Sequence, residues 1–80
     1  MAELLAFLAR ELVDEPEAVR VETEDRDDAV VLVLHVAPDD IGKVIGRQGR
    51  IARALRTLVR ASAARDGRRV LVEIADPDPA

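Results

Sequence analysis

The apolar positions of the first segment recur with the period of a helix. Between residues 2 and 13, a large apolar side chain returns every three or four positions, at Leu4, Leu5, Phe7, Leu8 and Leu12. This spacing places one apolar face on an α-helix. We therefore predict a helix over Ala2–Val13 that carries these side chains in the core and ends before Pro16.

The pattern then changes to the two-residue period of a strand. Val19, Val21 and Thr23 alternate with charged residues, which predicts a half-buried strand over residues 19–24 with one solvent-facing side. The following run AVVLVLHV is apolar on both faces, and its β-branched residues favour a central strand over a helix. The acidic stretch at residues 25–28 predicts a turn that joins the two strands into a hairpin.

Two helices and a last strand are predicted for the second half. Pro38 suits the first position of a short helix, and Gly46 can end that helix after Ile45. A longer helix is expected over residues 50–65. Its apolar stripe consists of Ile51, Leu55, Leu58, Val59 and Ser62. Beyond a turn, alternating apolar residues predict the last strand at residues 70–74.

The element order α-β-β-α-α-β predicts an α+β fold. Two helices separate the second and third strands, so these strands run parallel if they are neighbours, and the first strand pairs antiparallel with the second. We predict a three-stranded mixed sheet with three helices on one face. It forms a single domain over residues 1–80, ordered at about 2–76 and frayed at 77–80. On the sheet face that the helices leave uncovered, we expect Val31, Val33, His35 and Leu71. These residues either form an apolar patch that contacts another protein or are ordinary strand surface.

Composition limits the class of protein. The 80 residues allow one small domain, and 49% hydrophobic with 35% charged residues is typical of a folded chain rather than a disordered one. The absence of cysteine excludes disulfides and thiolate metal sites. The N-terminus lacks the pattern of a signal peptide, and no apolar run approaches the roughly 20 residues that span a bilayer. We expect a cytoplasmic protein that does not contact a membrane.

The charge is divided unevenly along the chain. Residues 1–40 hold three arginines and twelve acidic residues, whereas residues 41–65 hold seven basic residues and no acidic one. The net charge of −4 therefore conceals one basic segment. Such an asymmetry points to an anionic partner.

Glycines and basic residues meet in this segment, which begins GKVIGRQGR. Gly46 and Gly49 lie at the predicted corner between two helices, where the absence of Cβ atoms allows a ligand backbone to come close. The helix that follows presents its free N–H groups and its positive dipole end there, which suits a phosphate. The charged residues around the corner are Lys43, Arg47 and Arg50. The candidate floor of an adjoining groove is Ile41, Val44 and Ile45.

The stretch VIGRQGRI resembles the signature of the KH family, which is roughly (V/I)-I-G-x-x-G-x-x-I. The chain departs from it in one place, because Ile51 follows the second glycine by two residues and Ala52 takes the next position. The element order resembles the type II, or bacterial, KH arrangement over about residues 2–76. The chain also resembles bacterial proteins that consist of one KH domain.

The resemblance implies binding of single-stranded RNA, with a clamp on about four nucleotides. It assigns the clamp on the RNA backbone to Gly46, Arg47, Gln48 and Gly49. It places Lys43 and Arg50 beside the clamp, and the bases over Ile41, Val44 and Ile45. It further implies a second KH-containing partner, RNA chaperone-like activity, and a part in the control of cell-wall synthesis and cell length. Because one such groove is short, we expect a homodimer or a pairing with another KH protein.

Three observations keep other interpretations open. The acidic turn at residues 25–28 would face the groove of a type II domain and oppose phosphate. The only aromatic residue, Phe7, is predicted to be in the core, which leaves none to stack on bases. Arg53, Arg56 and Arg60 are compatible with a solvated helix face. The alternative function is a protein-interaction module for dimerisation or scaffolding, in which the glycine corner is only a turn.

Catalysis has little support in the sequence. His35 is the only histidine, and the few hydroxyl side chains have no evident base as partner. The phosphate-loop pattern GxxxxGK[ST] is absent. We expect no enzyme activity, cofactor, metal or small-molecule substrate. A weaker alternative is an enzyme subunit that holds a phosphorylated substrate at the glycine corner.

Overall fold

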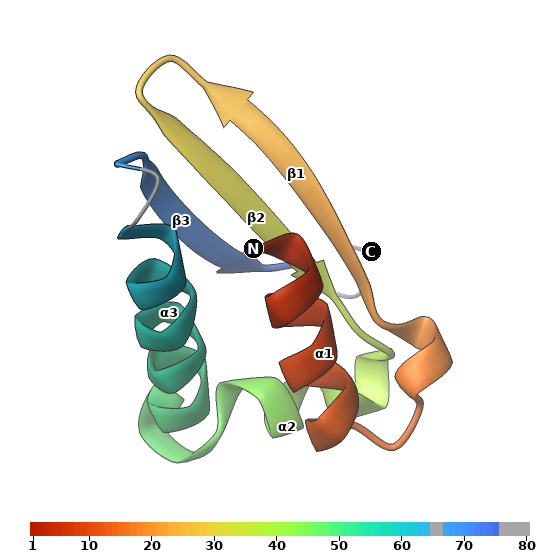
Figure 1. The fold of residues 1–80 in the computed structure, drawn as a ribbon. Coiled ribbons are helices and arrows are strands. Elements are labelled where there is room, and N and C mark those ends of the chain that lie inside the picture. The colour runs from red at the N-terminus through yellow and green to blue at the C-terminus, as the bar shows by residue number, and fades with distance from the viewer. Residues whose placement is uncertain (65–66, 76–80) are drawn as a thin grey trace.

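The computed structural model describes residues 1–64 and 67–75. Its helices and strands follow one another as α1 (Ala2–Leu12), β1 (Arg20–Arg26), β2 (Ala29–His35), α2 (Ile41–Ile45), α3 (Arg50–Ala63) and β3 (Arg69–Ile74) (Figure 1). Short 3₁₀ turns at Pro16–Ala18, Pro38–Asp40 and Arg47–Gly49 lie between them. The predicted order of elements is confirmed.

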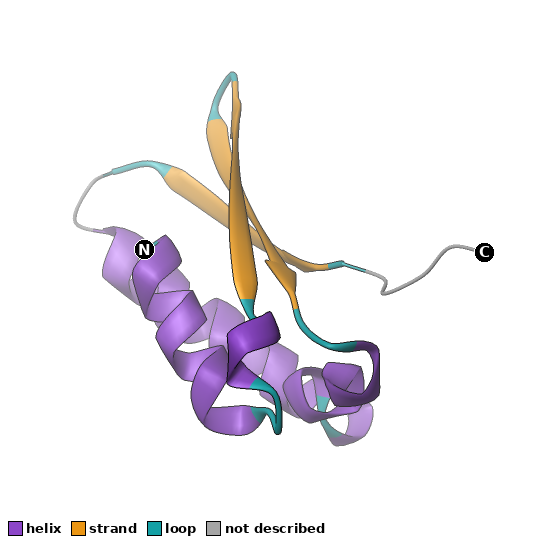
Figure 2. Cartoon of the chain, turned by 90° about the vertical axis from the view of Figure 1, so that its right-hand side faces the viewer, coloured by secondary structure: helices purple, strands orange, loops and turns teal. Residues whose placement is uncertain are grey.

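The three strands form one mixed sheet in the order β1-β2-β3. β1 pairs antiparallel with β2, with Val21 opposite Leu34, and β2 pairs parallel with β3, with Leu34 opposite Ile74. Figure 2 shows the helices gathered on one side of this sheet. The predicted α+β fold, with a three-stranded mixed sheet covered by three helices on one face, is therefore confirmed.

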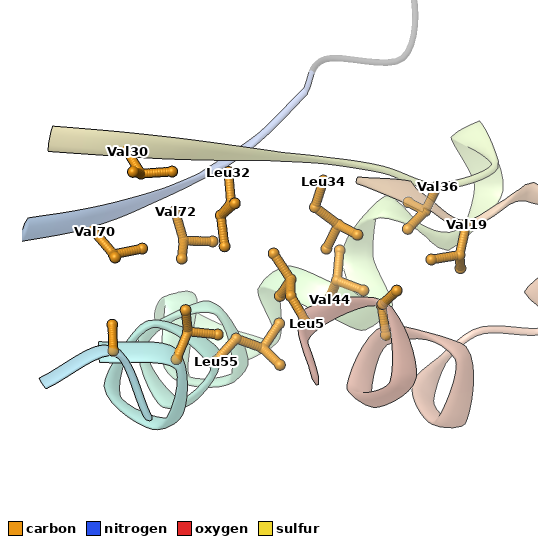
Figure 3. Close-up of a cluster of buried hydrophobic side chains, with 14 residues drawn as sticks. Leu5, Val19, Val30, Leu32, Leu34, Val36, Val44, Leu55, Val70 and Val72 are labelled. Atoms are coloured by element: carbon orange, nitrogen blue, oxygen red, sulfur yellow. The ribbon is translucent and has the colours of Figure 1, made fainter. Parts of the chain in front are cut away.

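The core lies between the sheet and the helices. Leu32 and Leu34 point from β2 toward the helical layer, where Leu5 of α1 and Val44 of α2 meet them (Figure 3). From α3, Leu55 and Val59 complete the cluster. Burying a side chain of this size contributes about 1.5–3 kcal/mol, so even the five-residue helix α2 is held firmly by Val44. This packing positions the corner between α2 and α3.

The predictions of which residues of α1 and α3 face the core are partly wrong. Phe7 is 58% exposed and Leu58 is 50% exposed, whereas both were expected in the core. Ser62 is exposed as well. The physical reason is the use of alanine, because small side chains on the inner faces let α1 and α3 lie close to their neighbours. These inner residues are Ala6 and Ala9 of α1 and Ala52 and Ala63 of α3.

The expected patch on the uncovered sheet face is also narrower than predicted. Val31 is fully buried, although it points away from the helices. It lies in the central strand, between Glu24 of β1 and Leu71 of β3. Glu24, which is opposite Val31, pairs with Arg26 at 3.2 Å. Long charged side chains on a neighbouring strand can cover apolar surface with their stems. Only part of the predicted patch is therefore accessible.

Some predictions fall outside the described residues. The expected helix end at Arg65, the turn residue Asp66 and the tail at 77–80 belong to this group. Gly67 is described, and it adopts a positive φ of 71° in a turn, as expected for a glycine there. No helix among the described residues is long and apolar enough to cross a bilayer. The boundaries of the domain stay a prediction.

Candidate nucleic-acid interface

The corner between α2 and α3 needs both of its glycines. The N–H of Gly46 ends α2 by donating to the Gly42 carbonyl at 2.9 Å, and Gly46 then adopts φ 76° and ψ 173°. That region is essentially restricted to glycine. Gly49 takes the left-handed conformation and donates to the Gly46 carbonyl at 3.1 Å. A Cβ on Gly46 would lie 2.6 Å from Cγ1 of Ile51, so this glycine also makes room for α3.

The two residues between the glycines are exposed, and Gln48 carries backbone strain. Among the described residues, Gln48 is the only non-glycine residue with a positive φ, at 56°. For an ordinary residue this conformation costs about 1–2 kcal/mol. Within residues 1–64 and 67–75, the N–H groups of Arg47 and Gln48 donate to no protein acceptor. Strain of this kind is typical of segments that bind ligands.

The first turn of α3 adds positive potential at the same place. Gly49 caps this helix without a side-chain hydrogen bond, and no acidic residue lies in its first turn. The first N–H groups of an α-helix have no partner inside the helix, and its dipole is positive there. Arg47 and Arg50 are exposed, and neither pairs with a carboxylate of the described residues. The corner can therefore attract an anion.

Lys43 differs from these arginines because carboxylates already surround it. Its Nζ lies 2.5 Å from Oδ2 of Asp14 and 3.5 Å from Oδ1 of Asp40. Hydrogen bonding to Asp14 raises the pKa of Lys43, although partial burial acts in the opposite direction. The charge of Lys43 is thus paired with Asp14, which lies in the connection between α1 and β1. Sequence reasoning missed this contact because the two residues are 29 positions apart.

Asp40 anchors this arrangement. Only 1% of the residue is exposed, and its Oδ2 accepts a hydrogen bond from the N–H of Glu15 at 3.1 Å. Burial alone would raise its pKa. The backbone N–H groups of Glu15 and Asp14, together with Lys43, outweigh that effect and lower the pKa of Asp40. A buried, charged Asp40 therefore ties the segment before the 3₁₀ turn at Pro16–Ala18 to the start of α2.

The three residues expected to line a groove have different surroundings. Ile45 is 37% exposed and lies at the end of α2, directly beside the corner. Ile41 is half-buried against the core. Val44 is fully buried, so it supports the groove from beneath and presents no surface of its own.

The acidic turn lies far from the corner, contrary to the prediction that it would face the groove. The β1–β2 turn and the α2–α3 corner lie at opposite ends of the molecule in two perpendicular views (Figures 1 and 2). β1 also extends to Arg26, so Asp25 belongs to a strand, where it accepts a hydrogen bond from Arg68 at 3.1 Å. The turn therefore places no negative charge beside the glycines.

Arg56 of α3 is not on a solvated helix face. It is half-buried, and its Nε donates to the carbonyl of Val72 in β3 at 3.3 Å. One side of α3 thus packs along β3, which lies at an edge of the sheet. The other side of α3 lies beside α1, and the two helices enclose an apolar groove of about 380 Å³. Its main apolar lining is Leu8, Leu12, Ile51, Ala54, Leu55 and Leu58.

Comparison with known proteins identifies relatives over almost the whole chain. Residues 2–74 match the family model described as KhpA/KhpB, KH domain. The RNA-binding protein KhpA of Caldanaerobacter subterraneus subsp. tengcongensis is 51% identical over 74 residues, which cover 92% of this chain and 99% of the relative. The proteins of the same name from Clostridium perfringens and Treponema pallidum are 49% and 51% identical over 74 residues, with 92% of this chain and 99% and 92% of the relatives covered.

A solved structure shares the fold. The crystal structure of Era from Aquifex aeolicus superposes with a TM-score of 0.65 at 21% sequence identity. The similarity covers 91% of this chain and 28% of that chain. At this level of identity, the match concerns the arrangement of helices and strands.

Proposed function

This chain belongs to the KhpA/KhpB family of KH domains, and we propose that it binds single-stranded RNA at the corner Gly46–Gly49. The names of its relatives support RNA as the partner. The observation that carries the proposal is the corner itself. It combines two glycines that the backbone requires, a strained Gln48, and exposed N–H groups at the start of a helix. Residues with a strained backbone cluster at ligand-binding sites, which favours this proposal over an ordinary turn.

In this proposal the RNA backbone is held by main-chain and charged groups together. The N–H groups of Arg47 and Gln48 donate to phosphate oxygens, and the side chains of Arg47 and Arg50 supply charge-assisted hydrogen bonds. The missing Cβ atoms of Gly46 and Gly49 let the sugar–phosphate backbone come close. A clamp of this kind accommodates about four nucleotides.

The neighbouring residues have supporting roles. We propose that Ile45 and Ile41 offer apolar surface to the bases, with Val44 beneath them. Lys43 acts mainly by holding α2 in place through Asp14. Because the corner carries no aromatic residue for stacking, the affinity of one domain is low and depends strongly on salt.

The test is a charge reversal at the corner. The double variant Arg47→Asp/Gln48→Asp places negative charge on the proposed phosphate path and should abolish binding of short RNA in fluorescence anisotropy at low and physiological salt. Circular dichroism checks that the fold is kept. Arg10→Asp is the control, because Arg10 is exposed on α1 and lies outside the corner. A double variant that binds as tightly as the parent would exclude the corner as the clamp.

We further propose that the domain acts as a homodimer or with a KhpB-like partner. The apolar groove between α1 and α3 supports this proposal, because Leu58 and Leu12 leave 50% and 37% of their surface exposed there. Apolar surface of this kind often marks a protein contact. Leu58→Asp places a charge in the groove and should convert a dimer to a monomer in analytical ultracentrifugation. An unchanged sedimentation coefficient would rule out this groove as the interface.

From the family relationship alone, we propose a role as an RNA chaperone or post-transcriptional regulator in the cytoplasm. The proposed cellular setting is the control of cell-wall synthesis and cell length. The second candidate function is a protein-interaction module with little RNA binding of its own, which the groove between α1 and α3 favours. Failure of the parent protein to bind RNA at low salt would select this second candidate.

A further inference from the structure

Three arginines surround a hollow at the end of α3 that is remote from the corner. The hollow has a volume of about 370 Å³ and lies between the end of α3 and the start of β3. Arg60, Arg68 and Arg69 line it, over a floor that includes the buried residues Ala63 and Val70. The end of α3 and the start of β3 thus bring three positive charges to one place, where their mutual repulsion favours an anionic ligand.

The described residues compensate the positive charge of this hollow only in part. Arg68 pairs with Asp25 at 3.1 Å, and both side chains are at least half exposed. Among the described residues, neither Arg60 nor Arg69 forms an ion pair. No carboxylate of residues 1–64 or 67–75 thus competes for these two guanidinium groups, whose donor geometry matches phosphate oxygens.

The corner and the hollow lie at the two ends of α3. α3 begins at the corner with Arg50 and ends beside the first residues of β3 (Figure 1). From Arg50 to Arg60 the rise is about 15 Å, at 1.5 Å per residue. Arg56 lies between them and contacts the carbonyl of Val72. Arg56 and Arg60 thus lie toward β3, whereas Arg50, at the start of α3, borders the groove with α1.

We infer that this hollow is a second phosphate-binding point for the single-stranded RNA that the corner holds. Arg60 and Arg69 contact the sugar–phosphate backbone several nucleotides beyond the clamp, after the strand has run along the length of α3. The inference rests on the proposed function, since it extends the path of the same RNA. It predicts that RNA longer than the clamp binds more tightly than RNA that only fills it.

The test compares two RNA lengths on a variant and a matched control. Arg60→Gln/Arg69→Gln removes two charges and keeps the stems of both side chains. The oligonucleotides are uridine oligomers of about four nucleotides, which fill the clamp, and of about eight, which reach the hollow. The control is Arg10→Gln/Arg20→Gln, because those two arginines line another hollow, between α1 and β1.

We expect Arg60→Gln/Arg69→Gln to weaken binding of the longer RNA only. Two lost phosphate contacts lower the slope of log K against log[salt] by about 1.4, which corresponds to roughly 20-fold weaker binding at 0.1 M salt. The short RNA should bind the variant as it binds the parent, and the control should resemble the parent with both. In the parent, the amide NMR signals of Val70 and Leu71 should shift with the longer RNA only.

Other outcomes separate this inference from the proposal on which it rests. If Arg47→Asp/Gln48→Asp loses both RNAs while Arg60→Gln/Arg69→Gln changes neither, the corner is the clamp and the second point is overturned. A loss that the control variant shares would overturn it too, since general charge would then explain the effect. If the parent binds neither RNA, the proposed function fails first. If the Val70 and Leu71 signals of the parent protein do not shift with the longer RNA, the second phosphate-binding point is overturned. This measurement holds even if the variant does not fold.

Discussion

Replacing Gly46 with alanine adds a methyl group where the corner has no room for it. The new Cβ would lie 2.6 Å from Cγ1 and 2.9 Å from Cβ of Ile51. Ile51 packs against the hydrophobic core, so it cannot simply rotate away. The backbone of Gly46, at φ 76° and ψ 173°, is also in a region that alanine avoids.

The two effects add to a large destabilisation. The unfavourable backbone region costs about 1–3 kcal/mol, and crowding in a packed site costs a further 1–3 kcal/mol or so. Alanine recovers roughly 0.4–1 kcal/mol because it makes the unfolded chain less flexible. We expect Gly46→Ala to lower the free energy of unfolding by about 2–5 kcal/mol. This is a large part of the roughly 5–15 kcal/mol that is typical of a small domain.

Two other glycines provide matched controls. Gly49 has a positive φ of 74°, but a Cβ there would meet nothing within 4 Å. Gly49→Ala should therefore show only the left-handed backbone cost of about 1–2 kcal/mol, less the gain in the unfolded chain. Gly42 lies inside α2 with open space around it, so Gly42→Ala should stabilise the protein by about 0.5–1 kcal/mol.

Urea denaturation followed by far-UV circular dichroism measures all three variants. The comparison uses the midpoint at constant m, because a changed m would indicate a change in compactness. The expected order of stability is Gly42→Ala above the parent, then Gly49→Ala, then Gly46→Ala. Equal destabilisation by Gly46→Ala and Gly49→Ala would refute the claim that contact with Ile51 makes Gly46 the more demanding position.

Two further predictions concern the carboxylates around Lys43. Asp14→Ala removes the closest partner of Lys43 and should free its charge, so the salt slope of RNA binding should steepen by up to about 0.7 in anisotropy titrations; an unchanged slope would contradict this. Because the pKa of Asp40 is lowered in the folded state, its contribution to stability is complete above the ordinary value near 3.9 and disappears as pH falls through the lower folded value. The pKa of Lys43 is raised, so its contribution is complete below about 10.4 and is lost as pH rises through the folded value. The urea midpoint should therefore decline at both extremes, and Asp40→Asn should flatten the acidic decline if Asp40 causes it.

The elements that the sequence predicts well are those with a local physical cause. Glycines at the corner adopt the positive φ angles that only glycine takes easily, so Gly46 and Gly49 could be placed before the structure was known. The β-branched run of β2 indicated a central strand for the same local reason. Most element boundaries followed to within one or two residues.

Features that depend on tertiary packing could not be predicted in this way. The hydrophobic pattern predicts that the large apolar side chains of a helix face the core. In α1 and α3, however, Ala9 and Ala63 are buried, whereas Phe7 and Leu58 are exposed. Contacts between distant segments carry no local signal, as the pair Lys43–Asp14 illustrates. The same holds for the hollow between α3 and β3, since nothing in the chain pattern joins Arg60 to β3.

The arrangement around α3 bears on how the proposed RNA binding and the proposed protein contact could work together. One side of this helix faces the core, one borders the apolar groove with α1, and one follows β3, so a protein partner and RNA need not compete. Two corners held in one dimer would bind a long RNA with an avidity that exceeds a single site by about 10²–10⁴. Arg50 lies at the rim of the groove as well as at the corner. If the proposed partner docks in this groove, it can change the affinity for RNA by reorienting Arg50, which borders both surfaces.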